Sequence, residues 1–200
     1  MTITTMRPSP DRGLHDPASE HDSCGFGLIA QVEGPGSRAI VDIALEALSR
    51  MAHRGGVAAD GLSGDGCGVL IHGAQRFLRT LADEAGIPLH SGSIAAGNVF
   101  LPVDDNAAAD CRSILHRELA KVGLRVAGWR DVPVDPAACG QLARSSMPRV
   151  QQVFVESDEA DTDAFERALF LARKRSEDAL RAYPDFHVVG LSPRLLGYKG

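Results

Sequence analysis

The chain has 200 residues, a formal net charge of −5, 44% hydrophobic residues and 24% charged residues. This composition is typical of a globular chain that can bury a sizeable core. It contains no dense cluster of basic residues, and no apolar run approaches the ~20 residues of a membrane-spanning helix. We therefore expect neither a nucleic acid nor a membrane as a partner.

The cysteines are few and widely spaced. They are Cys24, Cys67, Cys111 and Cys139, and they form no CxxC pair. This spacing argues against zinc, iron–sulfur and thioredoxin-type sites, so we predict no metal site in this chain. The N-terminus has no apolar signal segment, which together with the sparse cysteines favours a reducing, cytoplasmic location.

The first expected elements follow a polar leader. Residues 1–23 are rich in Pro, Asp, Ser and His and are predicted to be extended or disordered. Residues 24–32 are predicted to form a strand, because apolar side chains alternate along them. These side chains are Phe26, Leu28, Ala30 and Val32. A helix is predicted between an N-cap at Ser37 and the glycines Gly55 and Gly56, because apolar residues recur there at helical spacing.

The rest of the chain alternates between strand and helix patterns. We predict strands within 61–72, 98–103, 124–134, 150–156, 186–192 and 194–200, and helices over 74–85, 106–122 and 161–182. This order is compatible with a doubly wound α/β sheet and with a layered α+β fold, and the pattern alone does not separate the two.

Cys24 has two interpretations. A free cysteine beside an apolar run is usually a buried structural thiol. Alternatively, removal of residues 1–23 would expose Cys24 as an N-terminal nucleophile whose own α-amine serves as the base. The amine titrates near ~7.7–8.0 and a free thiol near ~8.5, so both groups are poised near neutral pH.

Three glycine-containing stretches also have local interpretations. GFGLIA, residues 25–30, matches the G-x-G-x-x-A dinucleotide fingerprint. We reject that site because no strand precedes the motif and no helix starts on it. MAHRGG (51–56) fits a helix C-terminus, and GDGCG (64–68) fits a tight turn before a strand.

Taken together, these stretches resemble one family. CGFGLIA and ALSRMAHRGGVAADGLSGDGCGVLI are followed in order by VGLRVAGWRDVPVD, SSMPRVQQVFV, LFLARKRSE and FHVVGLSPRLLGYKG. This series is similar to the amidotransferase region that opens the large subunit of glutamate synthase, and it runs from Cys24 to Gly200. The Cys-Gly start and the later His-Arg-Gly are shared with class II glutamine amidotransferases in general, whereas GWRDVP is typical of glutamate synthase.

The resemblance implies an α+β fold of the N-terminal-nucleophile (Ntn) hydrolase type, a four-layer αββα sandwich that would be incomplete in this chain. It implies that residues 1–23 are a propeptide and that 24–200 are the N-terminal part of a glutaminase domain. Cys24, freed by cleavage, would attack the side-chain amide of glutamine and release ammonia and glutamate. The other residues that match the family's site architecture are Gly25, Arg54, Gly55, Asp65 and Gly66.

Cofactors and further partners are implied for the complete enzyme, and none is expected within these 200 residues. In the family, ammonia reaches a distant FMN site, where 2-oxoglutarate is aminated with electrons delivered through iron–sulfur clusters. The implied partners are the remainder of the large subunit and either a small reductase subunit or ferredoxin. The family's oxyanion hole and glutamine-holding side chains have no counterpart before Gly200, so the alternative to a glutaminase is a non-catalytic truncated fragment of that enzyme.

Overall fold

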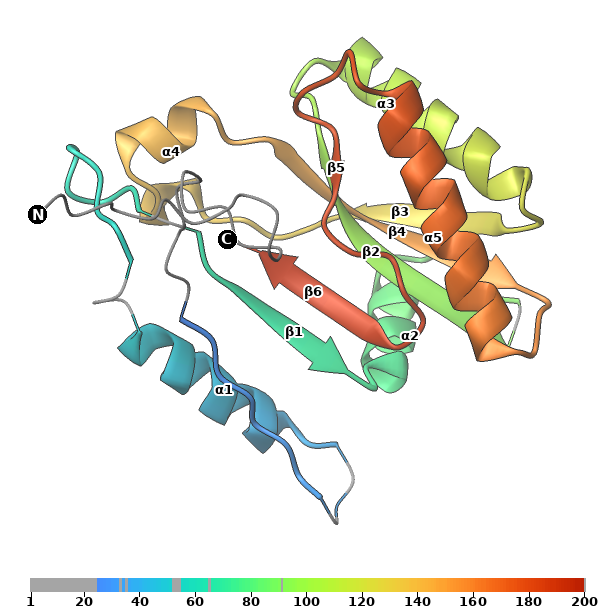
Figure 1. Ribbon diagram of the computed structural model, residues 1–200, viewed down its shortest axis with the longest axis horizontal. Helices are drawn as coiled ribbons and strands as arrows, with labels where there is room; N and C mark the ends of the chain where they lie inside the picture. The colour runs from blue at the N-terminus through green and yellow to red at the C-terminus, as the bar shows by residue number, and fades with distance from the viewer. Residues whose placement is uncertain are drawn as a thin grey trace, which may run out of the picture.

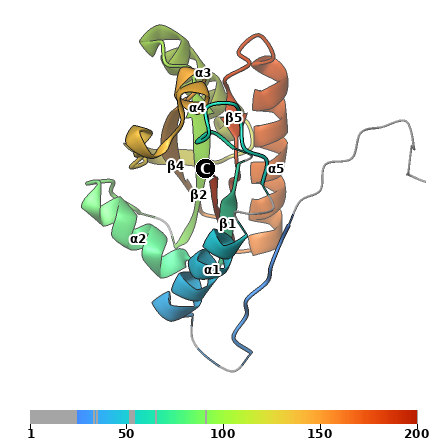
Figure 2. The ribbon, with the colours of Figure 1, turned by 90° about the vertical axis from the view of Figure 1, so that its left-hand side faces the viewer.

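The computed structural model describes residues 25–32, 34, 36–51, 55–64, 66–90 and 92–199. Within these ranges the chain forms two antiparallel sheets and a set of helices (Figures 1 and 2). The helices are α1 (Arg38–Arg50), α2 (Gln75–Glu84), α3 (Asp105–Ala120), α4 (Gln141–Ser145) and α5 (Thr162–Ala179), with a 3₁₀ turn, η2 (Pro136–Ala138). The strands are β1 (Gly68–His72), β2 (Ser93–Leu101), β3 (Arg125–Asp131), β4 (Arg149–Ser157), β5 (His187–Val188) and β6 (Leu195–Lys199).

Strands β2 and β4 form the centre of the larger sheet, whose order is β3-β4-β2-β5. They pair antiparallel along their whole lengths, from Ser93 opposite Ser157 to Leu101 opposite Arg149. Most of their residues are buried. Because both faces of the sheet are covered, these strands lack the alternation that a strand with one wet face shows.

Helices α3 and α5 cover one face of the larger sheet (Figure 1). Each starts at an aspartate that caps the helix, because its carboxylate accepts a hydrogen bond from a backbone N–H of the first turn. Asp104 accepts from Ala107 at 2.8 Å, and Asp161 accepts from Asp163 at 2.9 Å. The core between helices and sheet includes Leu115, Leu119, Phe165, Leu169, Val99, Val153 and Val155.

The opposite face of this sheet packs against α2 and β6. Its core includes Leu78, Leu81, Ile94, Phe154 and Leu196. Gly97 of β2 lies so close to the carbonyl oxygen of Gly190 that a Cβ at this position would overlap with it, so only glycine permits this approach. The Asn98 side-chain amide donates a hydrogen bond to the Gly197 carbonyl at 2.9 Å. Strand β6 is therefore held over the larger sheet, and its antiparallel partner β1 lies beside α1 (Figure 2).

This arrangement confirms the α+β prediction, and the doubly wound parallel alternative is wrong because every strand pair among the described residues is antiparallel. One helical layer, the larger sheet and the smaller sheet correspond to part of an αββα sandwich (Figure 1). In the described part of the chain, no helix is both long enough and apolar enough to cross a bilayer.

The strand predicted at 24–32 is wrong for the residues that the structure describes. Residues 25–32 form neither strand nor helix. Phe26, Leu28 and Val32 are 92%, 88% and 93% exposed. The alternating pattern was a valid signal for a half-buried strand, but a strand forms only where a partner supplies hydrogen bonds and covers one face.

The prediction for residues 1–23 lies outside the described residues. The remaining strand and helix predictions are confirmed with shifted ends. Strand β2 begins at Ser93, five residues before the predicted start at Asn98. Helix α1 forms as predicted after Ser37, but the Ser37 side chain makes no capping hydrogen bond and none of the helix residues is fully buried. Neither η2 nor α4 was predicted, since both are very short.

Candidate active site

The candidate site residues lie before α1 and between α1 and β1. Cys24, Arg54 and Asp65 lie outside the described residues, so their placement stays a prediction. Their neighbours Gly25, Gly55 and Gly66 are described, and all are exposed. The part of this region that the structure describes most fully is the segment 55–64, which connects the two glycine-containing motifs and is called the 55–64 loop below.

The 55–64 loop closes on itself through backbone hydrogen bonds. An isolated antiparallel bridge joins Val57 to Gly64. Inside it, the Ala58 N–H donates to the Ser63 carbonyl at 2.7 Å, and the Gly61 N–H donates to the Ala58 carbonyl at 3.0 Å. Gly61 has a φ of 73°, a left-handed conformation that favours glycine. The loop is therefore a tight reverse turn with Asp60 and Gly61 at its tip.

Asp60 fixes the tip of this loop with its carboxylate. Oδ1 accepts hydrogen bonds from the N–H of Ser63 at 2.7 Å and of Leu62 at 3.1 Å. Oδ2 accepts from the Ser63 hydroxyl at 2.6 Å and from the N–H of Leu142, at the start of α4, at 3.0 Å. The Ser63 hydroxyl oxygen in turn accepts from the N–H of Ala143 at 3.0 Å. Asp60 and Ser63 thus cap α4 from a distant part of the sequence.

The hydrogen bonds to Asp60 also stabilise its charge. They hold the pKa of this carboxyl well below its usual range, with the Ser63 hydroxyl as the largest cause and the Leu142 N–H as the next. Asp60 is therefore ionised at neutral pH, and its bonds to the loop and to α4 are charge-assisted.

Sequence reasoning did not identify Asp60 or Ser63 as site residues. The contacts within the loop were visible in the sequence, because an Asp-Gly step with a Ser two residues later is typical of a turn in which side chains bond the nearby backbone. The contacts with α4 left no signal in the sequence, since they join residues about 80 positions apart. Gly140 supplies the room for it, because a Cβ there would overlap with Asp60 Oδ2 and Ser63 Oγ.

Comparison with known proteins assigns the chain to a family. Residues 24–200 match the family described as glutamine amidotransferases class-II. The chain belongs to the class II glutamine amidotransferases. The match begins at Cys24 and includes every candidate site residue named above.

Several relatives of this amidotransferase chain are glutamate synthases. It is 35% identical over 190 residues to the glutamate synthase [NADPH] large chain of Azospirillum brasilense, covering 93% of this chain and 12% of the relative. It is 38% identical over 205 residues to ferredoxin-dependent glutamate synthase 1 of Arabidopsis thaliana, covering 98% and 12%. It is 34% identical over 192 residues to the glutamate synthase [NADPH] large chain of Bacillus subtilis, covering 94% and 13%. The chain thus spans about an eighth of the length of these relatives.

The first four residues of the GWRDVP stretch, Gly128 to Asp131, lie at the end of β3 and have a packing role. Trp129 Nε1 donates a hydrogen bond to His116 Nε2 at 2.7 Å, and the two rings stack. Burial, with a further contribution from Arg112, lowers the pKa of His116, which keeps the imidazole neutral and able to accept this bond. The tryptophan therefore joins β3 to α3.

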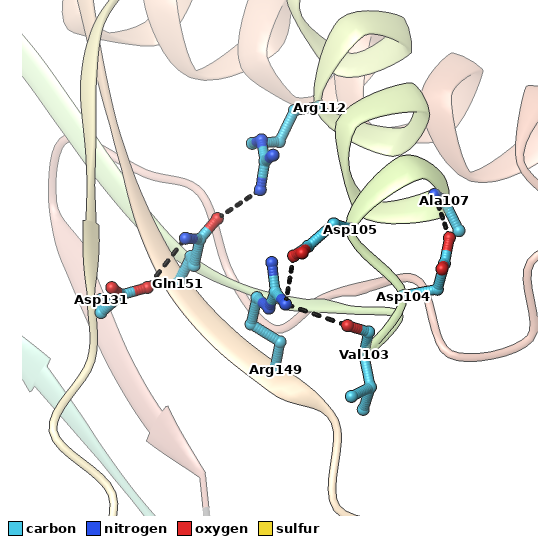
Figure 3. A network of polar contacts seen from close by, with 8 residues as sticks. All are labelled: Val103, Asp104, Asp105, Ala107, Arg112, Asp131, Arg149 and Gln151. Carbon is cyan, nitrogen blue, oxygen red and sulfur yellow. Dashed lines mark hydrogen bonds and ion pairs between the residues drawn. The ribbon is translucent and has the colours of Figure 1, made fainter.

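A second set of polar contacts fixes the end of β3 (Figure 3). Gln151 of β4 donates to Asp131 Oδ1 at 2.8 Å and accepts from Arg112 of α3 at 3.0 Å. Beside it, Arg149 donates to the Val103 carbonyl at 2.9 Å and to Asp105 at 2.7 Å. These contacts hold the point from which the chain leaves the sheet and continues to α4, the helix that Asp60 caps.

The described cysteines of this amidotransferase chain do not form a cluster. Cys67 is exposed, Cys139 is half-buried and Cys111 is fully buried, and all three are free thiols. Burial raises the pKa of the Cys111 thiol, which suits a structural residue of the core. Among the described residues, no group of three or more His, Cys, Asp or Glu side chains could hold a metal ion.

A groove of about 290 Å³ lies away from the described candidate residues. It is lined by residues of β1, α5 and the segment around β6, including Leu70, Glu166, Phe170, Arg173, Leu195 and Gly197. None of Gly25, Gly55, Gly66 and Asp60 lines it. The groove therefore adds no residue to the candidate site.

Proposed function

We propose that this chain carries the nucleophile of a glutaminase domain and that the complete protein is a glutamate synthase large subunit. The observation that carries the proposal is the family match, which starts at Cys24 and continues to the last residue of the chain. The glutamate synthases described above support the second part, because their similarity extends over 93% or more of this chain.

In the proposed reaction, removal of residues 1–23 gives Cys24 a free α-amine. The amine accepts the thiol proton, and the thiolate attacks the side-chain amide carbon of glutamine to form a tetrahedral intermediate. The amide nitrogen leaves as ammonia after it takes up a proton, and a γ-glutamyl thioester remains on Cys24. Water then attacks the thioester, glutamate departs, and the thiol is regenerated.

The matched residues around Cys24 have supporting roles in this proposal. In this proposal Arg54 and Gly55 would form an element beside the nucleophile, where a cation favours the thiolate form. Gly25 would be the small neighbour of the nucleophile, and Asp65 and Gly66 would shape the turn that precedes β1. The oxyanion hole and the side chains that hold glutamine are contributed by other parts of the domain.

In the complete protein, we propose that ammonia is used to convert 2-oxoglutarate to glutamate in the cytoplasm. FMN and iron–sulfur clusters would supply the reducing chemistry there. The described cysteines do not fit an iron–sulfur cluster, because they form no metal-binding group. We propose that FMN and the clusters are held outside this chain. The names of the relatives indicate NADPH for some and ferredoxin for others, so the proposed partner is a reductase subunit or ferredoxin.

The proposal is tested by the intact mass and glutaminase activity of the complete gene product. We expect a mature chain that begins at Cys24, ammonia release from glutamine, and loss of both cleavage and ammonia release in Cys24→Ala. Cys67→Ala is the matched control, because Cys67 is an exposed free thiol and should leave activity unchanged. A mature protein that retains residues 1–23 would contradict the role of Cys24.

The same assay on the 200-residue chain decides between a glutaminase and a non-catalytic fragment. One observation favours the non-catalytic fragment: among the described residues before Ala74, no hydrophobic side chain is buried. Ammonia release by the 200-residue chain that Cys24→Ala abolishes would refute the fragment alternative.

A further inference from the structure

The 55–64 loop is held by polar contacts and hardly at all by apolar burial. Its two large apolar side chains, Val57 and Leu62, are 70% and 73% exposed. Ser63, in contrast, is buried, and Asp60 joins the loop to α4. Since burial of apolar area is small here, the hydrogen bonds of Asp60 and Ser63 determine where the tip of the loop lies.

The N-terminal turn of α4, which contacts the loop, is complementary to it. The N-cap residue of helix α4 is Gly140, which has no side chain to cap the free N–H groups of the first turn. Asp60 accepts from Leu142 and Ser63 accepts from Ala143, so two of these N–H groups are satisfied by the loop. A side chain at Gly140 would collide with both Asp60 and Ser63. Loop and helix end are therefore complementary in shape and in hydrogen bonding.

The loop also connects the two motifs that the proposed function assigns to the site. Gly55 lies at its first residue, and Gly66 follows two residues after its end. The Val57 to Gly64 bridge closes the loop. We therefore expect a shift of its tip to reach both ends, which lie only a few residues away.

We propose that Asp60 is a positioning residue for the glutaminase reaction. It docks the 55–64 loop onto the Gly140–Ala143 turn. This contact fixes the motifs at both ends of the loop relative to the nucleophile. This inference rests on the proposed function. Asp60 does not itself take part in the chemistry, since its carboxylate is fully occupied by the loop and by α4.

The test uses Asp60→Ala, Asp60→Asn and Ser63→Ala in the complete gene product, with kcat and KM for ammonia release from glutamine. Misplacement of a site by about 1 Å can cost ~10²-fold in rate, so we expect kcat to fall by ~10–10²-fold in Asp60→Ala, with KM little changed. Asp60→Asn keeps one acceptor oxygen and should recover part of the loss. Ser63→Ala removes one donor to Asp60 and one acceptor for Ala143 and should show a smaller loss in the same direction.

Asp135→Ala is the matched control. Asp135 caps η2 by accepting from the Ala137 N–H at 3.0 Å, so it stabilises the same segment without touching the 55–64 loop. We expect its kcat to equal that of the unmodified protein. Hydrogen exchange of peptides covering 58–64 and 141–144 reports whether the loop has left α4.

The outcomes separate this inference from the proposed function. An unmodified protein without glutaminase activity overturns the proposed function and the positioning role with it. An active protein whose Asp60→Ala variant loses exchange protection at both peptides but keeps its kcat overturns the positioning role alone. An equal loss of kcat in Asp135→Ala also overturns it. If Asp60→Ala fails to fold, Asp60→Asn and Ser63→Ala decide, and unchanged kcat in both overturns the proposal.

Discussion

Asp60 accepts four hydrogen bonds with one carboxylate, which makes its contribution to stability dependent on pH. Its pKa in the folded chain is lowered, whereas an aspartate in an unfolded chain titrates near ~3.9. The stabilisation is therefore fully present above about pH 4 and is lost only as the pH falls from there towards the lowered folded value.

We predict that the difference in thermal unfolding midpoint between the unmodified protein and Asp60→Asn is constant from pH 8 to pH 5 and shrinks below about pH 4. The expected direction is lower stability for Asp60→Asn, because the amide carries no charge and one of its two oxygen acceptors is replaced by a donor. A difference that already shrinks between pH 8 and pH 5 would show that Asp60 is not held in its ionised form by these contacts.

Individual site residues were predictable to different degrees. Cys24, Arg54 and Asp65 came from family resemblance, and their geometry lies outside the described residues. Asp60 and Ser63 came only from the structure, because a side chain that caps a helix about 80 residues away leaves no mark in local spacing.

Helix α5 offers a direct comparison of a buried and an exposed phenylalanine on one element. Phe165 is 1% exposed in the core between α5 and the larger sheet, whereas Phe170 is 53% exposed. We predict that Phe165→Ala lowers the free energy of unfolding by about 3–5 kcal/mol, because it removes buried apolar area and leaves a cavity. Phe170→Ala should cost much less. Urea unfolding followed by circular dichroism measures both, and similar losses for the two variants would contradict the assignment of the buried face.

Elements with strong periodicity were predicted well, and elements that depend on distant partners were not. Helices α3 and α5 have apolar stripes and aspartate caps that are visible in the sequence. The first half of β2, SIAAG, was missed because small residues have low strand propensity and burial on both faces removes alternation. The α4 segment was missed because much of its capping comes from Asp60 and Ser63.

The core of the molecule is distributed unevenly along the chain. Both buried clusters draw their fully buried hydrophobic residues from Ala74 onwards. The described residues before Ala74 contribute α1 and β1, yet they hold exposed apolar side chains at Phe26, Leu28, Val32, Val57, Leu62 and Leu70. The part of the chain that carries the candidate site is therefore the part with the least core of its own.

This distribution predicts how the 200-residue chain behaves when it is produced alone. Contiguous exposed apolar surface is uncommon in stable monomers and favours association. We expect the chain to bind a hydrophobic fluorescent dye, and we expect the combined variant Phe26→Ser, Leu28→Ser and Val32→Ser to bind less. Because these three side chains are 88–93% exposed, their replacement removes apolar surface without removing core packing, so the unfolding midpoint should stay the same.

The control for dye binding is Val103→Ser combined with Val134→Ser. These two side chains are 67% and 52% exposed, but they lie on the segments that directly follow β2 and β3 of the larger sheet. Single exposed apolar residues of this kind are normal on protein surfaces, so this variant should leave dye binding almost unchanged. If both variants lower dye binding equally, the dye reports scattered surface residues. If only the first does, the segment next to Cys24 is the apolar surface that the chain leaves uncovered.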